Sequence, residues 1–111
     1  MNKIILFDHQ DNRFAELPTT LEERKKLIGA NNLGYVRTGL NNNIDIWFDK
    51  EGFYNSQYLC KITENGKTHC INGSFFVASV NDDGETVGLT SEQIREFSTY
   101  GYEYWEKINI F

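Results

Sequence analysis

The segment Ile71-Asn-Gly-Ser-Phe-Phe-Val-Ala-Ser-Val-Asn-Asp-Asp-Gly-Glu-Thr-Val-Gly-Leu-Thr-Ser-Glu-Gln-Ile94 decides the fold of this chain. Its aromatic and β-branched residues at 73–80 predict a central strand, and both parities of that strand are apolar, so we expect cover on both sides. Asn81-Asp-Asp-Gly84 predicts a tight turn, and 86–89 predicts the return strand. The segment specifies antiparallel structure.

The end of this segment predicts a helix. Thr90-Ser-Glu-Gln93 has the pattern of a capping box, which satisfies backbone N–H groups at a helix start. We expect the helix to run to Tyr100 or Gly101, with Ile94 and Phe97 facing inward against the strand. After it, Tyr102 to Phe111 alternates imperfectly, which predicts a last strand at Ile108 to Phe111.

The N-terminal part predicts a hairpin followed by a helix. A strand is expected at 3–7, a turn at Asp11-Asn12 and a return strand at 14–17 that Pro18 ends. Thr20-Leu-Glu-Glu23 is a second capping box, and Gly29 supplies the stop after Ile28. Leu21, Leu27 and Ile28 are the expected core-facing positions of this helix.

The middle of the chain predicts further strands. They are expected at 34–38 and 44–48, with Ile44, Ile46 and Phe48 facing one way, and Asp49-Lys-Glu-Gly52 is a turn. Phe53 to Tyr58 is irregular by pattern. A hairpin around Asn65-Gly66 follows, and its strands are expected at the periphery.

The register of that hairpin separates the two cysteines. A two-residue loop pairs Glu64 with Lys67, so Cys60 faces Ile71 rather than Cys70. Because side chains alternate between faces, the two thiols point to opposite sides, and we expect both to be unpaired.

Length and composition predict one small α+β domain, residues 1–111, with a mainly antiparallel β-sheet and two short helices. The chain has 111 residues, of which 40% are hydrophobic, enough for a single core. The apolar run at the N-terminus is shorter than the core of a signal peptide, and no stretch is long enough for a membrane span. We therefore expect a cytoplasmic protein of a bacterial host cell.

Charge is distributed unevenly. Residues 81–106 carry the acids Asp82, Asp83, Glu85, Glu92, Glu96, Glu103 and Glu106, against Arg95 as a base. The net charge of -5 argues against direct binding to a phosphate backbone. The acids either keep the protein soluble or form a patch that attracts a basic partner.

Catalytic and metal sites are not predicted. His69 and Cys70 are adjacent, so in a strand they lie on opposite faces and do not form a nucleophile and base pair. His9 stands beside a turn, and neither it nor the Asp82-Asp83 pair has the ligand spacing of a metal site. We expect a protein that is not an enzyme and that needs no cofactor.

The C-terminal segment is rich in aromatic residues. Tyr102, Tyr104 and Trp105 are interleaved with Glu103 and Glu106, a mixture suited to a basic protein surface. The other interpretation is that these rings cover one face of the sheet.

The order of these features resembles the small phage and plasmid family catalogued as domain of unknown function 3846. The resemblance spans about residues 14–97 and lies in the motifs Ile28-Gly29, Gly34-Tyr-Val, Ile44-Asp-Ile, Asp49-Lys-Glu-Gly52, Ile71-Asn-Gly73, Phe75-Phe-Val-Ala-Ser, Asp82-Asp-Gly-Glu and Leu89-Thr-Ser-Glu-Gln-Ile94. It implies no catalytic residues. It does imply a setting among the accessory genes of mobile elements that counter host defences.

The function expected from this combination is inhibition of a host defence nuclease, of the anti-CRISPR or anti-restriction type. The partner would be a defence protein with a basic surface, and the contact residues would be Asp82, Asp83, Glu85, Glu92, Glu96, Tyr102, Glu103, Tyr104, Trp105 and Glu106. No direct nucleic-acid or membrane binding is expected. One alternative is a small-ligand or nucleotide-derivative binding module, with Tyr35, Trp47, Phe53 and Tyr58 lining a pocket between subunits of a homo-oligomer. Another is a structural subunit of a phage or plasmid complex.

Overall fold

The helices and strands form an α+β domain. The computed structural model describes residues 2–8, 11–37, 44–55, 58–64, 66–99 and 101–106, apart from the side chains of Phe53, Asn55, Glu64, Lys67 and residues 101–106. Their order is β1 Lys3–Asp8, β2 Asp11–Glu16, α1 Leu21–Ile28, β3 Leu33–Arg37, β4 Ile44–Asp49, α2 Gly52–Asn55, β5 Tyr58–Glu64, β6 Lys67–Asn72, β7 Phe75–Val80, β8 Thr86–Val87, α3 Ser91–Phe97 and β9 Gly101–Glu106. Within these ranges, no helix has the length and apolar character that crossing a membrane requires.

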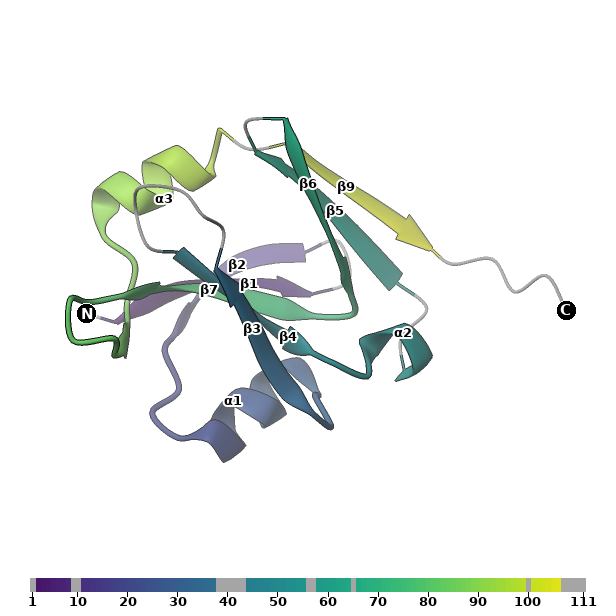
Figure 1. Ribbon diagram of the computed structural model, residues 1–111, viewed down its shortest axis with the longest axis horizontal. Helices are drawn as coiled ribbons and strands as arrows, with labels where there is room; N and C mark the ends of the chain where they lie inside the picture. Colours follow the sequence, from purple (N-terminus) through teal and green to yellow (C-terminus); the bar gives the residue numbers. More distant parts are fainter. Residues whose placement is uncertain are drawn as a thin grey trace, which may run out of the picture.

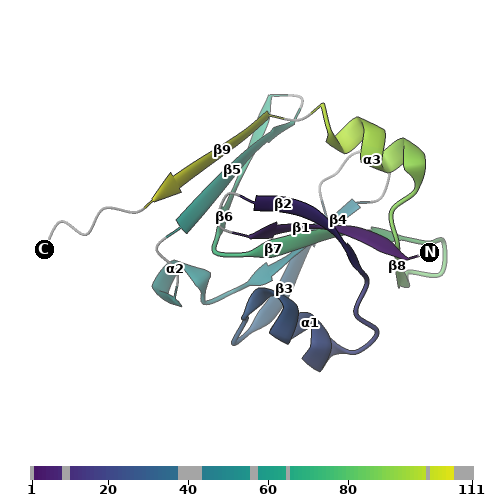
Figure 2. The same ribbon diagram turned by 180° about the vertical axis from the view of Figure 1, so that it is seen from behind.

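The strands form two antiparallel sheets. The larger sheet has six strands in the order β2-β1-β7-β4-β3, with β8 paired to β7, and the smaller has the order β6-β5-β9. Figure 1 shows α1 on one side of the larger sheet, and the smaller sheet and α3 on the other. The view from behind in Figure 2 shows the same layers, so the larger sheet lies in the middle of the molecule.

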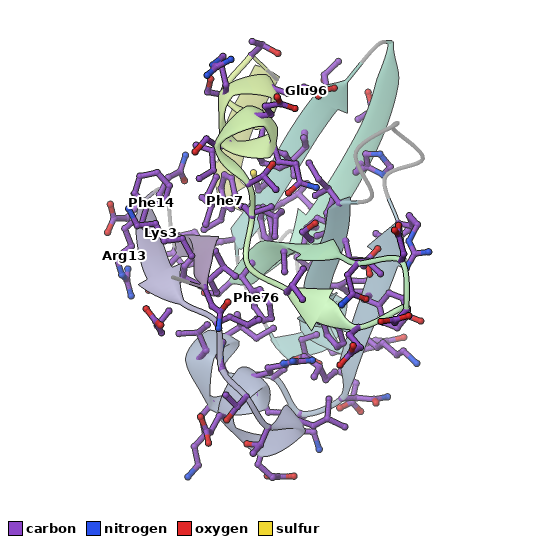
Figure 3. The ribbon with its side chains drawn as sticks, turned by 90° about the vertical axis from the view of Figure 1, so that its left-hand side faces the viewer. Lys3, Phe7, Arg13, Phe14, Phe76 and Glu96 are labelled. Carbon is purple, nitrogen blue, oxygen red and sulfur yellow. The ribbon has the colours of Figure 1, made fainter. Side chains whose placement is uncertain are left out.

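The central strand β7 is buried along its whole length, because each of its faces contributes to a separate core. Phe75 and Val77 pack with Phe97 of α3 and with residues of the smaller sheet. Phe76 and Ala78 pack on the side of α1. Phe7 and Phe76 accordingly point to opposite sides of the sheet in Figure 3. The expected two-sided cover of this strand is confirmed.

The hairpin of β5 and β6 has the register expected from its turn. Glu64 pairs with Lys67 and Cys60 pairs with Ile71, and Gly66 adopts a positive φ of 79°. Cys60 is buried, Cys70 is exposed, and neither is in a disulfide. The prediction of unpaired thiols is confirmed.

Both predicted helices begin at their predicted caps. The Thr20 side chain accepts a hydrogen bond from the Glu23 N–H, and α1 ends at Gly29 with a left-handed φ of 66°. At α3, the Thr90 side chain accepts from the Gln93 N–H, and the Gln93 side chain accepts from the Thr90 N–H. The capping-box pattern located both helix starts correctly.

Some boundaries differ from the prediction. Asp11 and Asn12 were expected in a turn but begin β2, because they pair with Asp8 and Phe7 of β1. The second helix ends at Phe97 rather than at Tyr100 or Gly101. There the Ser98 and Thr99 hydroxyls donate to the carbonyls of Arg95 and Glu96, and such side-chain bonds compete with continued helix formation.

Other corrections concern whole elements. Residues 52–55 form a single helical turn, although an irregular segment was expected. The strands β5 and β6 are not peripheral, because Cys60, Ile62 and Ile71 are buried in the same core as Phe75. The last strand described is β9 at 101–106, whereas the predicted strand at Ile108 to Phe111 lies outside the described residues.

Candidate functional site

The acids of residues 82–85 stand on a turn that is fixed by hydrogen bonds. The side-chain oxygen of Asn81 accepts from the N–H groups of Asp83 at 3.0 Å and Glu85 at 2.9 Å. Gly84 takes a φ of 80°, a conformation that suits glycine. Asp82, Asp83 and Glu85 are all exposed. The Glu85 carboxylate accepts from the Asn81 side-chain amide at 3.3 Å, and the exposed Asp82 and Asp83 stand on a turn whose backbone Asn81 holds.

The helix α3 presents two further acids from an anchored position. Gln93 is buried and donates to the Ser79 hydroxyl of β7 at 2.8 Å, and Phe97 is buried against Phe7 with ring centroids 5.9 Å apart. These contacts fix the rotation of the helix. Glu92 is then exposed and Glu96 is half-buried.

We name Asp82, Asp83, Glu85, Glu92 and Glu96 the acidic segment. The β7–β8 turn and α3 lie toward the same end of the molecule in Figure 1, and Figure 3 looks onto that end, with Glu96 labelled. Residues 81–97 carry Arg95, also exposed, as their base. The fold therefore gathers five predicted contact residues on the elements that follow β7.

The other predicted contact residues lie in β9. Its backbone pairs antiparallel with β5 along its whole length. The predicted contact residues Tyr102, Glu103, Tyr104, Trp105 and Glu106 face, in that order, Ile62, Lys61, Cys60, Leu59 and Tyr58. The side chains of these five residues lie outside the described part of the structure. The backbone shows that the aromatic segment is the third strand of the smaller sheet.

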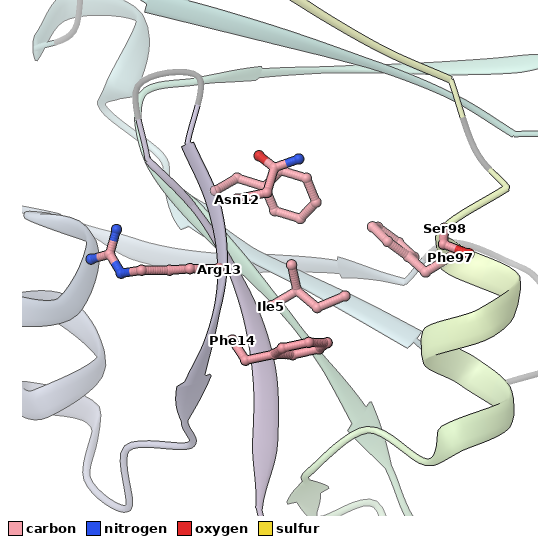
Figure 4. Close-up of a pocket in the computed structure, with 7 residues that line it drawn as sticks. Ile5, Asn12, Arg13, Phe14, Phe97 and Ser98 are labelled. Carbon is pink, nitrogen blue, oxygen red and sulfur yellow. The ribbon is translucent and has the colours of Figure 1, made fainter.

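An apolar groove of about 280 Å³ lies beside the C-terminal end of α3. Figure 4 shows Ile5 and Phe14 on the strand side and Phe97 on the helix side, with Asn12 and Ser98 near the rim. We call it the α3 groove. Phe14 is 56% exposed, so the groove offers an aromatic surface to solvent next to the acidic segment.

Two bases lie on the strand side of the α3 groove, and Figure 4 shows the Arg13 side chain pointing away from it. The Lys3 ammonium nitrogen lies 5.3 Å from the centroid of the Phe14 ring, a cation–π geometry. Arg13 lies 3.7 Å from the Asp8 carboxylate and 3.4 Å from that of Asp11, so its charge is already offset locally. On the helix side, Glu96 precedes Phe97 of the groove lining and adds a negative charge there.

A second groove, of about 410 Å³, lies between α1 and the β3–β4 edge of the larger sheet. Leu21, Glu22 and Lys25 contribute from α1, Leu33 and Tyr35 from β3, and Trp47 from β4, with Asn32 in the connection. We call it the Trp47 groove. Leu21 was expected in the core but is 59% exposed, because the first turn of α1 borders this groove.

The Trp47 indole N–H has no hydrogen-bond partner in the structure, although the nitrogen atom is buried. Leaving a buried donor unpaired costs about 1–3 kcal/mol. The Tyr35 and Trp47 rings are 5.0 Å apart at 34°, and the Arg24 guanidinium lies 5.0 Å from the Trp47 ring. Partial burial lowers the pKa of Arg24.

Of the four aromatic residues expected to line a pocket between subunits, two lie together within one chain. Tyr35 and Trp47 share the groove, whereas Tyr58 begins β5 in the smaller sheet and is not among the described residues that line it. The side chain of Phe53 lies outside the described part. Sequence reasoning missed the α1 contribution, because a leucine and a lysine in a helix carry no sign of a groove.

Arg37, Asp45 and Cys60 are ionisable groups whose contacts stabilise the fold. Arg37 donates to both carboxylate oxygens of the buried Asp45, at 2.9 and 3.3 Å, and this hydrogen bonding raises the pKa of Arg37. Burial raises the pKa of the Cys60 thiol to about 12, with a smaller contribution from Cys70. In the described ranges, no group of three or more His, Cys, Asp or Glu residues is placed to hold a metal ion.

Comparison with protein families gives one match. A family model described as a domain of unknown function, DUF3846, matches residues 1–101. The chain belongs to this family. The match extends the resemblance found in residues 14–97 back to the start of the N-terminal hairpin, and it ends where β9 of this DUF3846 protein begins. No curated protein and no solved structure matches the chain.

Proposed function

We propose that this DUF3846 protein is a mobile-element accessory protein that binds and inhibits a host defence nuclease. It is a binding protein without catalytic activity, and it offers its acidic segment to the basic channel in which the nuclease holds nucleic acid. The observation that carries this proposal is the exposure of Asp82, Asp83, Glu85 and Glu92 on hydrogen-bonded, anchored backbone. A rigid acidic surface can mimic part of the charge of a nucleic-acid backbone without binding nucleic acid itself.

The neighbouring α3 groove supports the same proposal. Protein interfaces combine an apolar centre with a charged rim, and electrostatic complementarity mainly sets the rate and specificity of association. The exposed Phe14 ring supplies the apolar centre above the buried Phe97, and Glu92 and Glu96 supply acids on the helix beside it. A basic partner with one protruding apolar side chain fits this arrangement.

The test compares two triple charge reversals in assays of nuclease inhibition. One variant carries Asp82→Lys, Asp83→Lys and Glu92→Lys. The matched control carries Glu16→Lys, Glu23→Lys and Glu51→Lys, which are exposed acids outside the acidic segment and change the net charge equally. Glu23 matches Glu92 because each lies in the first turn of a helix.

We expect the acidic-segment variant to lose inhibition of a CRISPR or restriction nuclease that the native protein inhibits, and the control variant to keep most of it. Association with the native protein should also slow as salt increases, because exposed charges are screened over about 8 Å at physiological ionic strength. Equal activity of the folded acidic-segment variant and the native protein against every inhibited nuclease would contradict the proposal.

A further inference from the structure

The Trp47 groove lies on the α1 side of the larger sheet, whereas α3 and its groove lie on the other side. Its volume of about 410 Å³ is within the range of small-ligand sites, roughly 300–1,000 Å³. Its walls are fixed at one end, because the Asp49 carboxylate accepts from the Asn32 N–H at 3.1 Å and the Asn32 carbonyl accepts from the Lys50 N–H at 2.8 Å.

The groove offers an aromatic surface for stacking. Tyr35 is 57% exposed, while Trp47 beneath it is 7% exposed and stacks on Phe76 at an interplanar angle of 5°. Stacking on the buried Phe76 ring fixes the orientation of the Trp47 ring. The exposed Tyr35 ring lies on the solvent side of the groove. A flat aromatic ligand placed against Tyr35 would bury apolar surface that the fold leaves in water.

The unpartnered indole N–H is a second feature that points to a ligand. Trp47 is more than nine-tenths buried, and its nitrogen has no acceptor in the structure. The nitrogen is covered from solvent, so binding in this way requires a side chain beside it to move, and the exposed Tyr35 ring, 5.0 Å from the Trp47 ring, is the candidate. An acceptor atom on the ligand would then satisfy a donor that the protein leaves unpaired.

The charges in the groove favour one anionic group. The Lys25 ammonium is 3.7 Å from the Glu22 carboxylate, whose side chain is 79% exposed, and such surface pairs are weak. Lys25 can therefore exchange this partner for an anion on a ligand. The nearby Glu22 carboxylate disfavours a second anionic group on the ligand.

We propose that the Trp47 groove binds a small planar aromatic compound that carries a single anionic group and a hydrogen-bond acceptor on its ring. The ring stacks on Tyr35, the anionic group contacts Lys25, and the acceptor receives the Trp47 indole N–H. A nucleoside monophosphate and a pyridine carboxylate both present an anionic group and a ring with an acceptor nitrogen, so the experiment includes both sources.

The assay uses the full chain with Trp105→Phe, so that Trp47 is the remaining tryptophan and reports by fluorescence. This protein is titrated with AMP and GMP in one arm and with the pyridine carboxylates nicotinate and picolinate in the other. Adenosine and nicotinamide serve as controls that lack the charge, and inorganic phosphate serves as the control that lacks the ring. We expect a saturable change with at least one aromatic anion, and binding weaker by about tenfold or more with every control.

Two pairs of variants locate the binding. Lys25→Ala should weaken binding about tenfold, whereas Lys26→Ala, at an exposed position of the same helix outside the groove, should leave it unchanged. Tyr35→Ala should weaken binding strongly, whereas Tyr35→Phe and Tyr54→Ala should not. Tyr54 is 85% exposed and lies in α2, away from the groove lining.

Trp47→Phe, followed by calorimetry, tests the indole donor directly, and its thermal unfolding checks that the fold persists. Whether the nucleotides or the aromatic carboxylates bind shows which of the two classes of compound the groove accepts. The proposal is overturned if no aromatic anion binds at millimolar concentration, or if binding persists unchanged in both Lys25→Ala and Tyr35→Ala.

Discussion

At the scale of single residues, the stacked pair of Phe7 and Phe75 carries much of the core beneath α3. Their ring centroids are 4.5 Å apart, and Phe75 is 1% exposed. Phe75→Ala should lower the free energy of unfolding by about 3–5 kcal/mol, because it leaves a cavity between two layers. Phe14→Ala, at a ring 56% exposed, should cost less than about 1 kcal/mol in the same urea titration. Similar costs for the two variants would show that the core is misplaced.

The two thiols give a second prediction. The exposed Cys70 should react with a thiol reagent in the native protein at about pH 8, and the buried Cys60 should react only after unfolding. The raised pKa of Cys60 has a further effect on stability. Its folded value is about 12 against an ordinary 9.0, so the contribution of this thiol to stability is fully present below about pH 9 and is lost as pH rises toward 12.

A count of reactive thiols, before and after denaturation, tests the first effect, and Cys70→Ser should abolish the fast reaction. Alkaline unfolding of Cys60→Ala tests the second, since that variant should show less loss of stability between pH 9 and 12 than the native protein. Two fast-reacting thiols in the native protein would contradict the burial of Cys60.

At the scale of elements, α2 approaches β6 so closely that its first residue has to be small. A Cβ atom at Gly52 would lie 2.5 Å from the Asn72 carbonyl oxygen, which is backbone and does not move aside easily. Gly52→Ala should therefore destabilise the protein by about 1–3 kcal/mol. Gly34→Ala is the matched control, because its Cβ would meet only the flexible side chain of Lys50. Comparable thermal shifts in the two variants would contradict this prediction.

Turn and capping motifs in the sequence correctly predicted the elements that depend on neighbouring residues. Asn65-Gly66 predicted the register of β5 and β6, and the two caps at Thr20 and Thr90 predicted both helix starts. The smaller sheet was not predicted, because β9 pairs with β5 across a long stretch of sequence and strand periodicity does not reveal the partner. Asp11 and Asn12 favour turns, but pairing with β1 outweighs that preference.

The candidate site was predictable to a similar extent. Acids in a turn or a helix start are expected at the surface, and the five members of the acidic segment are exposed or half-buried as expected. The Trp47 groove depends instead on how α1 packs across Tyr35 and Trp47. That packing joins residues from three elements, and no single motif encodes it.

At the scale of the whole molecule, the two cores share the central strands of the larger sheet. One contains Ile46 and Val77, and the other contains Trp47 and Phe76, so neighbouring residues of β4 and β7 belong to different cores. We expect a single cooperative unfolding transition. In the Trp105→Phe background, Trp47 fluorescence and the exposure of the Cys60 thiol should report the same urea midpoint. Separate midpoints would show that the cores unfold independently.

The burial of β7 on both faces also bears on how such a protein can change over generations. A substitution within Phe75–Val80 has to fit two packed interiors at once, so few replacements are tolerated there. The turn that follows is held by its backbone and by Asn81, which leaves Asp82 and Asp83 open to replacement. A lineage that carries this fold can therefore alter the charge of this turn while its interior stays the same.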